Sequence, residues 1–478
     1  MKTAIHWFRR DLRLHDNTAL NSAAAEADGR VVTVYILSEW KGQHHWVGPN
    51  RQEFLCESLR LLAADLEKIG GQLIVRCGKA EEELEKLLAE TKAEAIYCNR
   101  DPDPFGRGQE DAVAKMAERR GAKFYAEKDV AMFERDDLLS GTGKSYRVYS
   151  PYFRAWAKLE MPPVGPKLGK LFAPPKIKSL PLPDLSHWKL KSEGTRIIAA
   201  GEDAARKRLE SFLSPTGGVK EYATRRNILG DDTSSRLSQD LRWGLLSIRE
   251  VFHRARALAE ELPKNRREHA DKFVSEVAWR DFYMQILFFF PNVLDEDFNP
   301  ATRGLPWVWE RDEPEAFARW CEGRTGFPLV DAAMRQLSGL GFMHNRLRII
   351  TAMFLTKDLR FHWREGEALF MRKLVDGEIS NNNGNWQWSA GTGADAAPYF
   401  RIQNPWTQSE RFDVDGKFIK EWCPELRDVP AERLHVAPAP GMRLAKNYPP
   451  PMVDHAQERD RTLAMFKKHR VESKPVQE

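Results

Sequence analysis

Over the first 129 residues, short apolar segments alternate with segments of helical periodicity, and few folds accommodate such a pattern. Segments with the composition of strands occupy residues 4–8, 30–37, 72–77, 95–99 and 123–126. The helical segment between the second and the third has one apolar stripe, formed by Leu55, Leu59, Leu62, Leu66 and Ile69. Strands and helices that alternate in this way predict a parallel α/β sheet with helices on its faces.

A proline-rich segment follows the predicted sheet. Seven prolines lie between Met161 and Pro183, too many for a helix or a central strand. After residue 197 the periodicity is helical, with helices expected at residues 204–213, 241–261, 272–290, 315–321, 329–337, 345–359, 365–374 and 455–468. We therefore expect an α/β domain over residues 1–132, a long interdomain linker over 133–196 and an all-α domain over 197–478.

The composition is that of a globular protein that stays in the cytoplasm. The longest apolar run, residues 286–290, is too short to cross a membrane, and the first residues lack the apolar stretch of a signal peptide. The 5 cysteines show no Cys-x-x-Cys spacing, which argues against a zinc or iron–sulfur site. Because the net charge is only +5, local clusters of Arg and Lys give modest support for nucleic-acid binding.

The segment over residues 381–401 is the strongest indication of a binding site. Four asparagines fall within residues 381–385, and buried amides need hydrogen-bonding partners, which a polar ligand can supply. Trp386 and Trp388 lie two residues apart, so in a helix or a strand they serve two different surfaces. The alternative is a pair of core aromatic residues in an irregular loop, but the neighbouring amides favour a site.

Three further clusters are typical of ligand sites, although each also has an ordinary structural explanation. The hydroxyls within residues 233–238 precede a helix, where they could bind a phosphate or cap the helix. Glu276 shares a helix face with Trp279 and Arg280, which could hold and stack a flipped base or form a salt bridge beside a core indole.

The third cluster is charged. Arg348 and Asp376 could form a charge-assisted pair, and Glu378 adds a second carboxylate. No histidine cluster with metal-ligand spacing accompanies these carboxylates, so we expect no metal.

Taken together, these motifs resemble the photolyase/cryptochrome family, and most of all the bacterial class I cyclobutane pyrimidine dimer photolyases. The resemblance covers the whole chain in outline and is close over residues 233–426. Its segments are long and specific: HWFRRDLRLHDN at residues 6–17, GRTGFPLVDAAMR at 323–335 and NNNGNWQWSAGTGADAAPYFR at 381–401.

The resemblance implies light-driven repair of pyrimidine dimers in DNA. FAD, active in its reduced anionic form, would bind the helical domain below a cavity that accepts the flipped dimer. Residues 103–107 do not clearly match one antenna type, so the α/β domain would bind methenyltetrahydrofolate or a deazaflavin as a second, antenna chromophore, or neither. The implied partner is UV-damaged DNA; we expect a monomer with no obligatory protein partner, associated with the nucleoid if the source is bacterial.

The matching positions imply roles for particular residues. FAD contacts fall at Tyr222, Ser234, Ser235, Arg236, Leu237, Ser238, Phe273, Glu276, Arg280, Asn345, Arg348, Asp376, Glu378 and Asn382. Dimer contacts fall at Glu276, Trp279, Asn345, Ile349 and Trp388, and DNA contacts at Arg226, Trp279, Arg346, Trp388 and Arg401. Trp386, Trp363 and Trp309 match an electron relay from the flavin to the surface.

Two alternatives are a cryptochrome-type blue-light receptor and a photolyase for the (6-4) lesion. Asn382, the position expected to face flavin N5, favours repair because related receptors carry Asp or Cys there. Asn345 stands where the (6-4) enzymes usually carry a second histidine. Ile349 and Phe273 depart from the Met and Trp of close relatives, so we expect retuned packing and not a lost activity.

Overall fold

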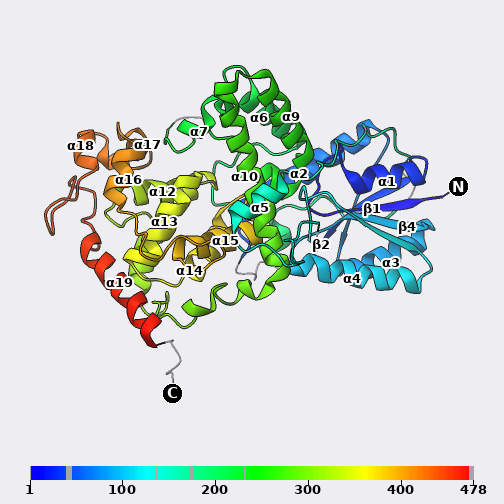
Figure 1. The fold of residues 1–478 in the computed structure, drawn as a ribbon. Helices are drawn as coiled ribbons and strands as arrows, with labels where there is room; N and C mark the ends of the chain where they lie inside the picture. The colour runs from blue at the N-terminus through cyan, green and yellow to red at the C-terminus, as the bar shows by residue number, and fades with distance from the viewer. Residues whose placement is uncertain (1, 39–45, 136, 173–176, 231–232, 473–478) are drawn as a thin grey trace. The chain divides into compact units, whose positions relative to one another are not determined.

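A computed structural model describes residues 2–38, 46–135, 137–172, 177–230 and 233–472 (Figure 1). Contacts divide the chain into two compact units. Unit 1 comprises residues 1–193, 198–223 and 234–291, and unit 2 comprises residues 194–197, 224–233 and 292–478. The limits predicted from the sequence, at residues 132 and 196, stay a prediction.

Unit 1 begins with the predicted parallel sheet. Its strands are β1 (Ala4–Phe8), β2 (Val31–Leu37), β3 (Leu73–Cys77), β4 (Ala95–Asn99) and β5 (Lys123–Glu127), in the order β3-β2-β1-β4-β5. The central strand β1 pairs Ala4 with Val31 on one side and with Ala95 on the other. All five predicted strands are therefore confirmed.

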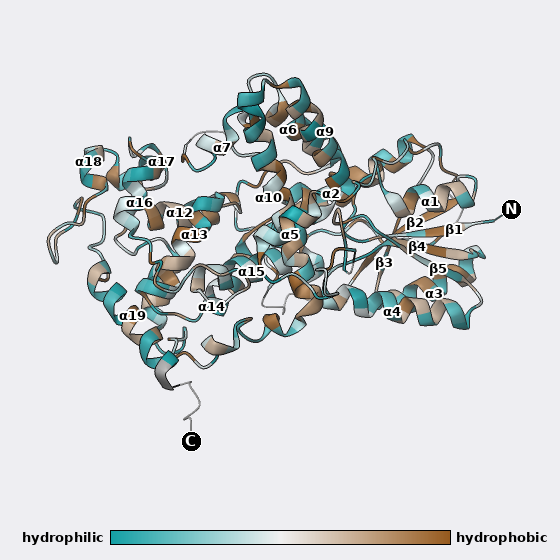
Figure 2. Ribbon diagram, in the orientation of Figure 1, coloured by the Kyte–Doolittle hydropathy of each residue, from teal (hydrophilic) through white to brown (hydrophobic). Residues whose placement is uncertain are grey.

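Four helices cover the two faces of this sheet. They are α1 (Thr18–Glu26), α2 (Pro49–Lys68), α3 (Ala80–Thr91) and α4 (Pro104–Arg119). Figure 1 shows α3 and α4 together along one face, with α1 on the other. The strands are largely apolar, whereas α3 and α4 carry many polar residues (Figure 2). Ile5, Val32 and Ile96 lie in the core between these layers.

The remaining regular elements of unit 1 are helices. They are α5 (Tyr149–Trp156), η1 (Leu185–Trp188), α6 (Glu202–Leu213), η2 (Gly218–Glu221), α8 (Ser238–Trp243), α9 (Ile248–Glu261) and α10 (Lys264–Phe289). The short helix α7 (Tyr222–Arg225) and η3 (Pro291–Leu294) fall where the two units meet along the chain. The proline-rich residues 161–172 and 177–183 form no helix or strand.

The single helix predicted over residues 241–261 is wrong, because the chain forms two helices there. Gly244 ends α8 with a left-handed φ of 62°, and a Cβ at this position would lie 2.0 Å from the carbonyl oxygen of Arg10. Ser247 then caps α9 by accepting hydrogen bonds from Arg249 N and Glu250 N. The apolar period continues through this break, which hides it in the sequence.

A buried ion network fastens α9 to the sheet within unit 1. Arg13 Nη2 and Arg249 Nη2 each lie 2.8 Å from Asp129 Oδ1, and Arg249 Nε lies 3.0 Å from Asp16 Oδ2. Burial would raise the pKa of Asp129, but the two guanidinium groups outweigh it and lower this pKa to about 2. The carboxylate therefore remains charged in the core.

Unit 2 is helical. It contains η4 (Pro300–Thr302), α11 (Pro314–Cys321), α12 (Pro328–Leu340), α13 (Asn345–Met353), the π-helical turn η5 (Phe354–Asp358), α14 (Trp363–Lys373), α15 (Ile379–Ala390), α16 (Pro405–Phe412), α17 (Lys417–Trp422), η6 (Pro424–Leu426), α18 (Ala431–Leu434) and α19 (His455–Glu472). The parallel sheet followed by helices confirms the predicted fold class. The predicted helix over residues 345–359 ends earlier as an α-helix, because the π turn interrupts it.

In the described part of the chain, no helix is both long enough and apolar enough to span a membrane.

Candidate functional site

The amide-rich segment forms α15, whose first turns hold a partly buried amide cluster in unit 2. Asn382 Nδ2 donates to the carbonyl oxygen of Glu367 at 3.0 Å. Asn383 Nδ2 donates to Glu367 Oε1 and to the carbonyl oxygen of Val293, both at 3.0 Å. Because the amide nitrogen of Asn382 is engaged, its Oδ1 is the atom that can accept a hydrogen bond from a ligand.

Glu367 is a buried acid that supports this cluster. It lies on α14 with an exposed fraction of 2%. Burial raises the pKa of Glu367 to about 8, although the hydrogen bond from Asn383 opposes the shift. The side chain is therefore largely a neutral carboxylic acid near pH 7, and no negative charge stands behind Asn382.

The predicted pair of Arg348 and Asp376 is present. Arg348 Nη2 lies 2.8 Å from Asp376 Oδ2, and Arg348 Nε donates to the carbonyl oxygen of Met343 at 2.8 Å. The other carboxylate oxygen, Asp376 Oδ1, is buried and accepts no hydrogen bond within the described residues. An orphaned acceptor of this kind fits a ligand that brings an N–H or O–H donor. Glu378 is the N-cap residue of α15, and it accepts a hydrogen bond from Asn381 Nδ2.

Trp386 and Trp388 diverge on α15. Trp386 is 2% exposed, and its ring contacts Trp320 and Phe370 at centroid distances of 6.2 and 4.9 Å. Trp388 is only partly buried. The two indoles thus serve an interior and a more open surface, as their spacing predicts.

Gly366 brings Trp386 against the backbone of α14. A Cβ at Gly366 would lie 2.1 Å from Trp386 Cη2 and 2.7 Å from Leu355 Cδ2. Trp363 lies three residues before Gly366 and therefore shares its helix face. The absence of a side chain at Gly366 lets Trp386 approach the helix that carries Trp363.

Gly366→Ala is expected to destabilise the protein by about 1–3 kcal/mol, because the added methyl group overpacks the contact with Trp386. The better helix propensity of Ala, about 1 kcal/mol, offsets only part of this loss. Urea denaturation measures the change. Gly108→Ala on α4 is the matched control, since a Cβ there meets nothing within 4 Å and should be neutral or stabilising. Equal behaviour of the two variants would contradict the packing argument.

The other two predicted relay residues lie near one histidine in unit 2. Trp363 is fully buried and donates from Nε1 to Asp297 Oδ1 at 2.8 Å. Trp309 is partly exposed and stacks on His362 at a centroid distance of 4.2 Å. The order Trp386, Trp363, Trp309 therefore runs from buried rings to a ring that reaches solvent.

In unit 1, the predicted base-stacking residue lies on α10. Trp279 is half-buried and stacks on Tyr149 with a centroid distance of 3.6 Å and an interplanar angle of 9°. Glu276, one turn earlier, forms an ion pair with Lys272 at 2.7 Å. Glu276 thus forms a helical salt bridge with Lys272, whereas the sequence suggested Arg280 as the partner.

The remaining predicted cofactor residues of unit 1 form an aromatic cluster and a loop. Phe273 contacts Phe212 and Tyr222 at centroid distances of 4.8 and 5.5 Å. The hydroxyl-bearing residues 234–238 lead into α8, where the N-cap position is Leu237 and no side chain caps the helix. Arg280 donates to the carbonyl oxygens of Val130 and Leu241, so some of its guanidinium donors are used in hydrogen bonds to the backbone.

The predicted DNA-binding residues of unit 2 lie on α13 and in loops. Asn345 begins α13, and Ile349 lies one turn later on the same face. Arg346 donates to Asn227 Oδ1 at 3.0 Å and stands over the ring of Phe412. Arg226 is partly exposed and Arg401 is exposed. Their roles toward DNA stay predictions.

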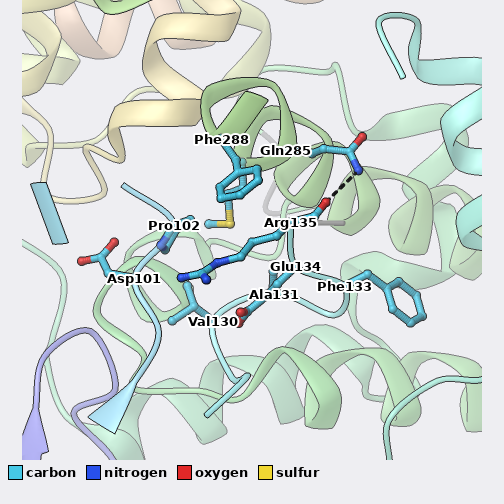
Figure 3. A pocket seen from close by; sticks show the side chains of 10 residues that line it. Asp101, Pro102, Val130, Ala131, Phe133, Glu134, Arg135, Gln285 and Phe288 are labelled. Atoms are coloured by element: carbon cyan, nitrogen blue, oxygen red, sulfur yellow. Dashed lines mark hydrogen bonds between the residues drawn. The ribbon is translucent and has the colours of Figure 1, made fainter. Parts of the chain in front are cut away.

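Unit 1 also contains a small cavity beside α10 (Figure 3). Its volume is about 20 Å³, and it is lined by Asp101, Pro102, Val130, Ala131, Phe133, Glu134, Arg135, Met284, Gln285 and Phe288. Gln285 Nε2 donates to the carbonyl oxygen of Arg135, whereas its Oε1 is buried and accepts no hydrogen bond in the described structure. Burial raises the pKa of Glu134 to about 8.

Four residues that contact the predicted site residues were missed by sequence reasoning: Tyr149, His362, Asp297 and Glu367. Tyr149 falls in the segment interpreted as linker, yet it lies on α5 and carries the stack with Trp279. An aromatic spacing of three and four, at Tyr149, Tyr152 and Trp156, was the available signal for a buried helix. The contacts of the other three residues depend on tertiary structure alone.

Among the described residues, no group of three or more His, Cys, Asp or Glu side chains could hold a metal ion.

Two family models match the chain. The model described as "DNA photolyase" matches residues 4–168, and the model described as "FAD binding domain of DNA photolyase" matches residues 273–468. A protein of Agrobacterium fabrum named deoxyribodipyrimidine photo-lyase is 37% identical, and the match covers 98% of each chain.

Solved structures show the same likeness. A class III photolyase from Agrobacterium tumefaciens superposes with a TM-score of 0.90 at 35% identity over 98% of each chain. An archaeal photolyase from Sulfolobus tokodaii with two FAD molecules has a TM-score of 0.84 at 30% identity, with 98% of this chain and 100% of that chain covered. A cryptochrome of Synechocystis has a TM-score of 0.86 at 28% identity, covering 97% of this chain and 99% of that one.

Proposed function

This chain belongs to the DNA photolyase family, and we propose that it acts as a deoxyribodipyrimidine photo-lyase, which uses light to repair cyclobutane pyrimidine dimers in DNA. The observation that carries the proposal is the amide cluster at the start of α15. Asn382 has its nitrogen engaged by Glu367 O, and a neutral Glu367 stands behind it. This arrangement leaves an uncharged acceptor where the family resemblance places flavin N5.

The residues of the chain fit FAD as the resident cofactor. Asp376 Oδ1 is a buried acceptor that accepts no hydrogen bond within the described residues, and Arg348 pairs with the second oxygen of the same carboxylate. We assign Tyr222, Ser234, Ser235, Arg236, Leu237, Ser238, Phe273, Glu276, Arg280, Asn345, Arg348, Asp376, Glu378 and Asn382 to FAD binding. When bound in its reduced anionic form, FAD supplies on illumination the electron that opens the cyclobutane ring.

The chain itself binds and orients the substrate. Trp279 presents a half-buried indole face, held in place by its stack on Tyr149, on which a flipped pyrimidine dimer can lie. Glu276, Asn345, Ile349 and Trp388 complete the proposed dimer contacts, and Arg226, Arg346 and Arg401 the proposed phosphate contacts. No side chain has to act as a general acid or base, because ring opening by the arriving electron, followed by the return of that electron, moves no proton.

The receptor alternative is weaker on one observation. A blue-light receptor of this family carries Asp or Cys at the position of Asn382, according to the resemblance, and here an amide occupies it with Glu367 largely neutral. The likeness to a cryptochrome structure keeps a receptor as the second candidate. We further propose a monomer that acts on damaged DNA in the cytoplasm, without an obligatory protein partner.

We propose that a second chromophore binds unit 1 over the residues around this cavity, because the cavity itself, at about 20 Å³, has room for about one water molecule. The ring of Phe288 forms one wall, and the guanidinium groups of Arg107 and Arg135 lie over it at 4.6 and 5.7 Å. Gln285 Oε1 offers a free acceptor to a ligand donor. The two FAD molecules in the archaeal relative add a second flavin to the candidates, besides methenyltetrahydrofolate and a deazaflavin.

Repair of a defined lesion tests the function. The purified flavoprotein is chemically reduced, mixed with oligothymidine that carries cyclobutane dimers, and illuminated with blue light, while recovery of thymine absorbance is followed against a dark control. Light-dependent recovery supports the proposal. A flavin-loaded, reduced protein that restores no thymine would contradict it and favour the receptor.

Trp279→Ala is expected to weaken binding to dimer-containing DNA by about 1–3 kcal/mol, the cost of one lost base-stacking face. Flavin content should be unchanged, and a fluorescence anisotropy titration measures the affinity. Trp422→Ala, which removes another half-buried indole from α17, serves as the control. Loss of flavin from the Trp279 variant would show that this indole belongs to the cofactor site.

A further inference from the structure

His362 lies between two of the three tryptophans assigned to the relay. Its imidazole stacks on Trp309 with a centroid distance of 4.2 Å and an interplanar angle of 23°. It also contacts Trp363 at a centroid distance of 5.5 Å and an angle of 39°. No direct ring contact joins Trp363 to Trp309 in the described part of the chain. The imidazole is therefore the ring that both indoles share.

Backbone pairing fixes this arrangement. Val308 forms a parallel bridge with Phe361, in which Val308 N donates to Arg360 O and His362 N donates to Val308 O, both at 2.8 Å. Because Trp309 follows Val308 and His362 follows Phe361, the bridge places the two rings side by side. The stack is thus held by main-chain hydrogen bonds in addition to ring packing.

The protonation of His362 is fixed as well. Its Nδ1 accepts a hydrogen bond from Arg364 N at 3.2 Å, so His362 caps the N-terminus of α14 and its single ring proton must lie on Nε2. Burial, with a smaller contribution from Arg364, lowers the pKa of His362 to about 4. An uncharged ring does not repel the positive charge that an oxidised neighbouring indole carries.

From this geometry we propose that His362 is a positioning residue of the electron relay, a neutral π bridge through which Trp309 passes its electron to Trp363. The proposal rests on the relay of the proposed function, in which Trp386 and then Trp363 have each given up one electron. In the bridged step Trp309 loses one electron and Trp363 regains one. Trp363 returns to a neutral indole, Trp309 becomes the radical cation, and the imidazole gains and loses nothing.

Two substitutions separate the bridge from the helix cap. His362→Asn keeps a side chain that caps helices well but removes the ring. His362→Phe keeps a neutral aromatic ring but cannot cap. Transient absorption after a laser flash follows electron transfer from Trp309 to Trp363 in protein with oxidised FAD, and thermal denaturation reports on the cap.

If His362 is the bridge, the variant with the faster radical formation should have the lower thermal midpoint. His362→Asn should keep the thermal midpoint yet slow the formation of the Trp309 radical by about tenfold or more, tenfold being about 1.4 kcal/mol in the activation free energy. His362→Phe should lower the midpoint yet keep fast radical formation. His344→Asn is the matched control, because His344 caps α13 through the same Nδ1 bond, to Arg346 N at 3.1 Å, on a helix without a relay tryptophan.

Other outcomes overturn the proposal. Fast radical formation in His362→Asn would show that the ring is dispensable, and slow formation in His362→Phe alone would reduce His362 to a helix cap. Trp309→Phe is measured in parallel, because it tests the tryptophan relay separately from the His362 bridge. If Trp309→Phe leaves photoreduction unchanged, the assigned relay is wrong, and the proposed role of His362 is contradicted as well.

Discussion

Asp129→Asn is expected to destabilise unit 1 by about 3–5 kcal/mol, because it leaves two buried guanidinium groups without their shared carboxylate. Arg13 and Arg249 both lie 2.8 Å from Asp129 Oδ1, and Arg249 would keep only Asp16. A loss of this size is a large part of the 5–15 kcal/mol of stability typical of a folded protein. Urea denaturation followed by far-UV circular dichroism measures it.

The pH dependence provides the internal check. The pKa of Asp129 is about 2 in the folded protein, below its ordinary value of 3.8, so its contribution is fully present above about pH 4. This contribution is lost as the pH falls from about 4 toward 2. The stability difference between the wild type and Asp129→Asn should therefore shrink over that range.

The exposed pair of Lys2 and Glu26 is the control for this experiment. Glu26→Gln removes a carboxylate whose partner is in solvent, so no measurable loss is expected. A small effect of Asp129→Asn at neutral pH would show that the two arginines find other partners, and the ion network would then not fasten α9 to the sheet.

Trp363→Phe is expected to abolish most light-driven reduction of oxidised FAD, because it removes the middle residue of the proposed relay. Phe cannot give up an electron as readily as an indole, and Trp363 is fully buried and contacts His362. Repair by protein that has been reduced chemically should be retained. Steady blue illumination with an external electron donor, monitored by flavin absorbance, measures the reduction.

The matched comparison is Trp320→Phe. Trp320 is also fully buried and contacts Trp386 at 6.2 Å, but it is not assigned to the relay. Normal photoreduction in Trp320→Phe with a strong loss in Trp363→Phe supports the assignment. The reverse result would move the relay to α11, and a loss of repair by reduced Trp363→Phe protein would show damage to the site itself.

The sequence predicts the elements of this fold well where a local pattern decides them. The five strands follow from apolar segments separated by turns, and α2 follows from the stripe that includes Leu55 and Leu66. Gly244 shows where this fails: it ends α8 because the backbone of Arg10 approaches it, and that contact spans more than 230 residues of sequence. The apolar period alone gives no sign of it.

The candidate site divides in the same way. The amides of α15 and the pair of Arg348 and Asp376 can be recognised in the sequence, because amide and charged residues by themselves indicate hydrogen bonds and ion pairs. His362 is not visible, because its importance comes from the bridge between Val308 and Phe361. Glu367 reads as an ordinary helix surface residue, and only burial gives it a raised pKa. A motif shows which side chains could bind a ligand, whereas their burial and their contacts become known only from the tertiary structure.

The make-up of unit 2 has a consequence for how the protein is synthesised. Two early segments belong to this late unit: Arg196 N donates to Gly339 O, and Leu229 N donates to Phe412 O. On a ribosome that adds about 5–20 residues per second, Leu229 emerges roughly 10–40 s before its partner. The nascent chain must therefore keep both segments unpaired and soluble during that wait, and a fragment that starts at residue 292 would lack them entirely.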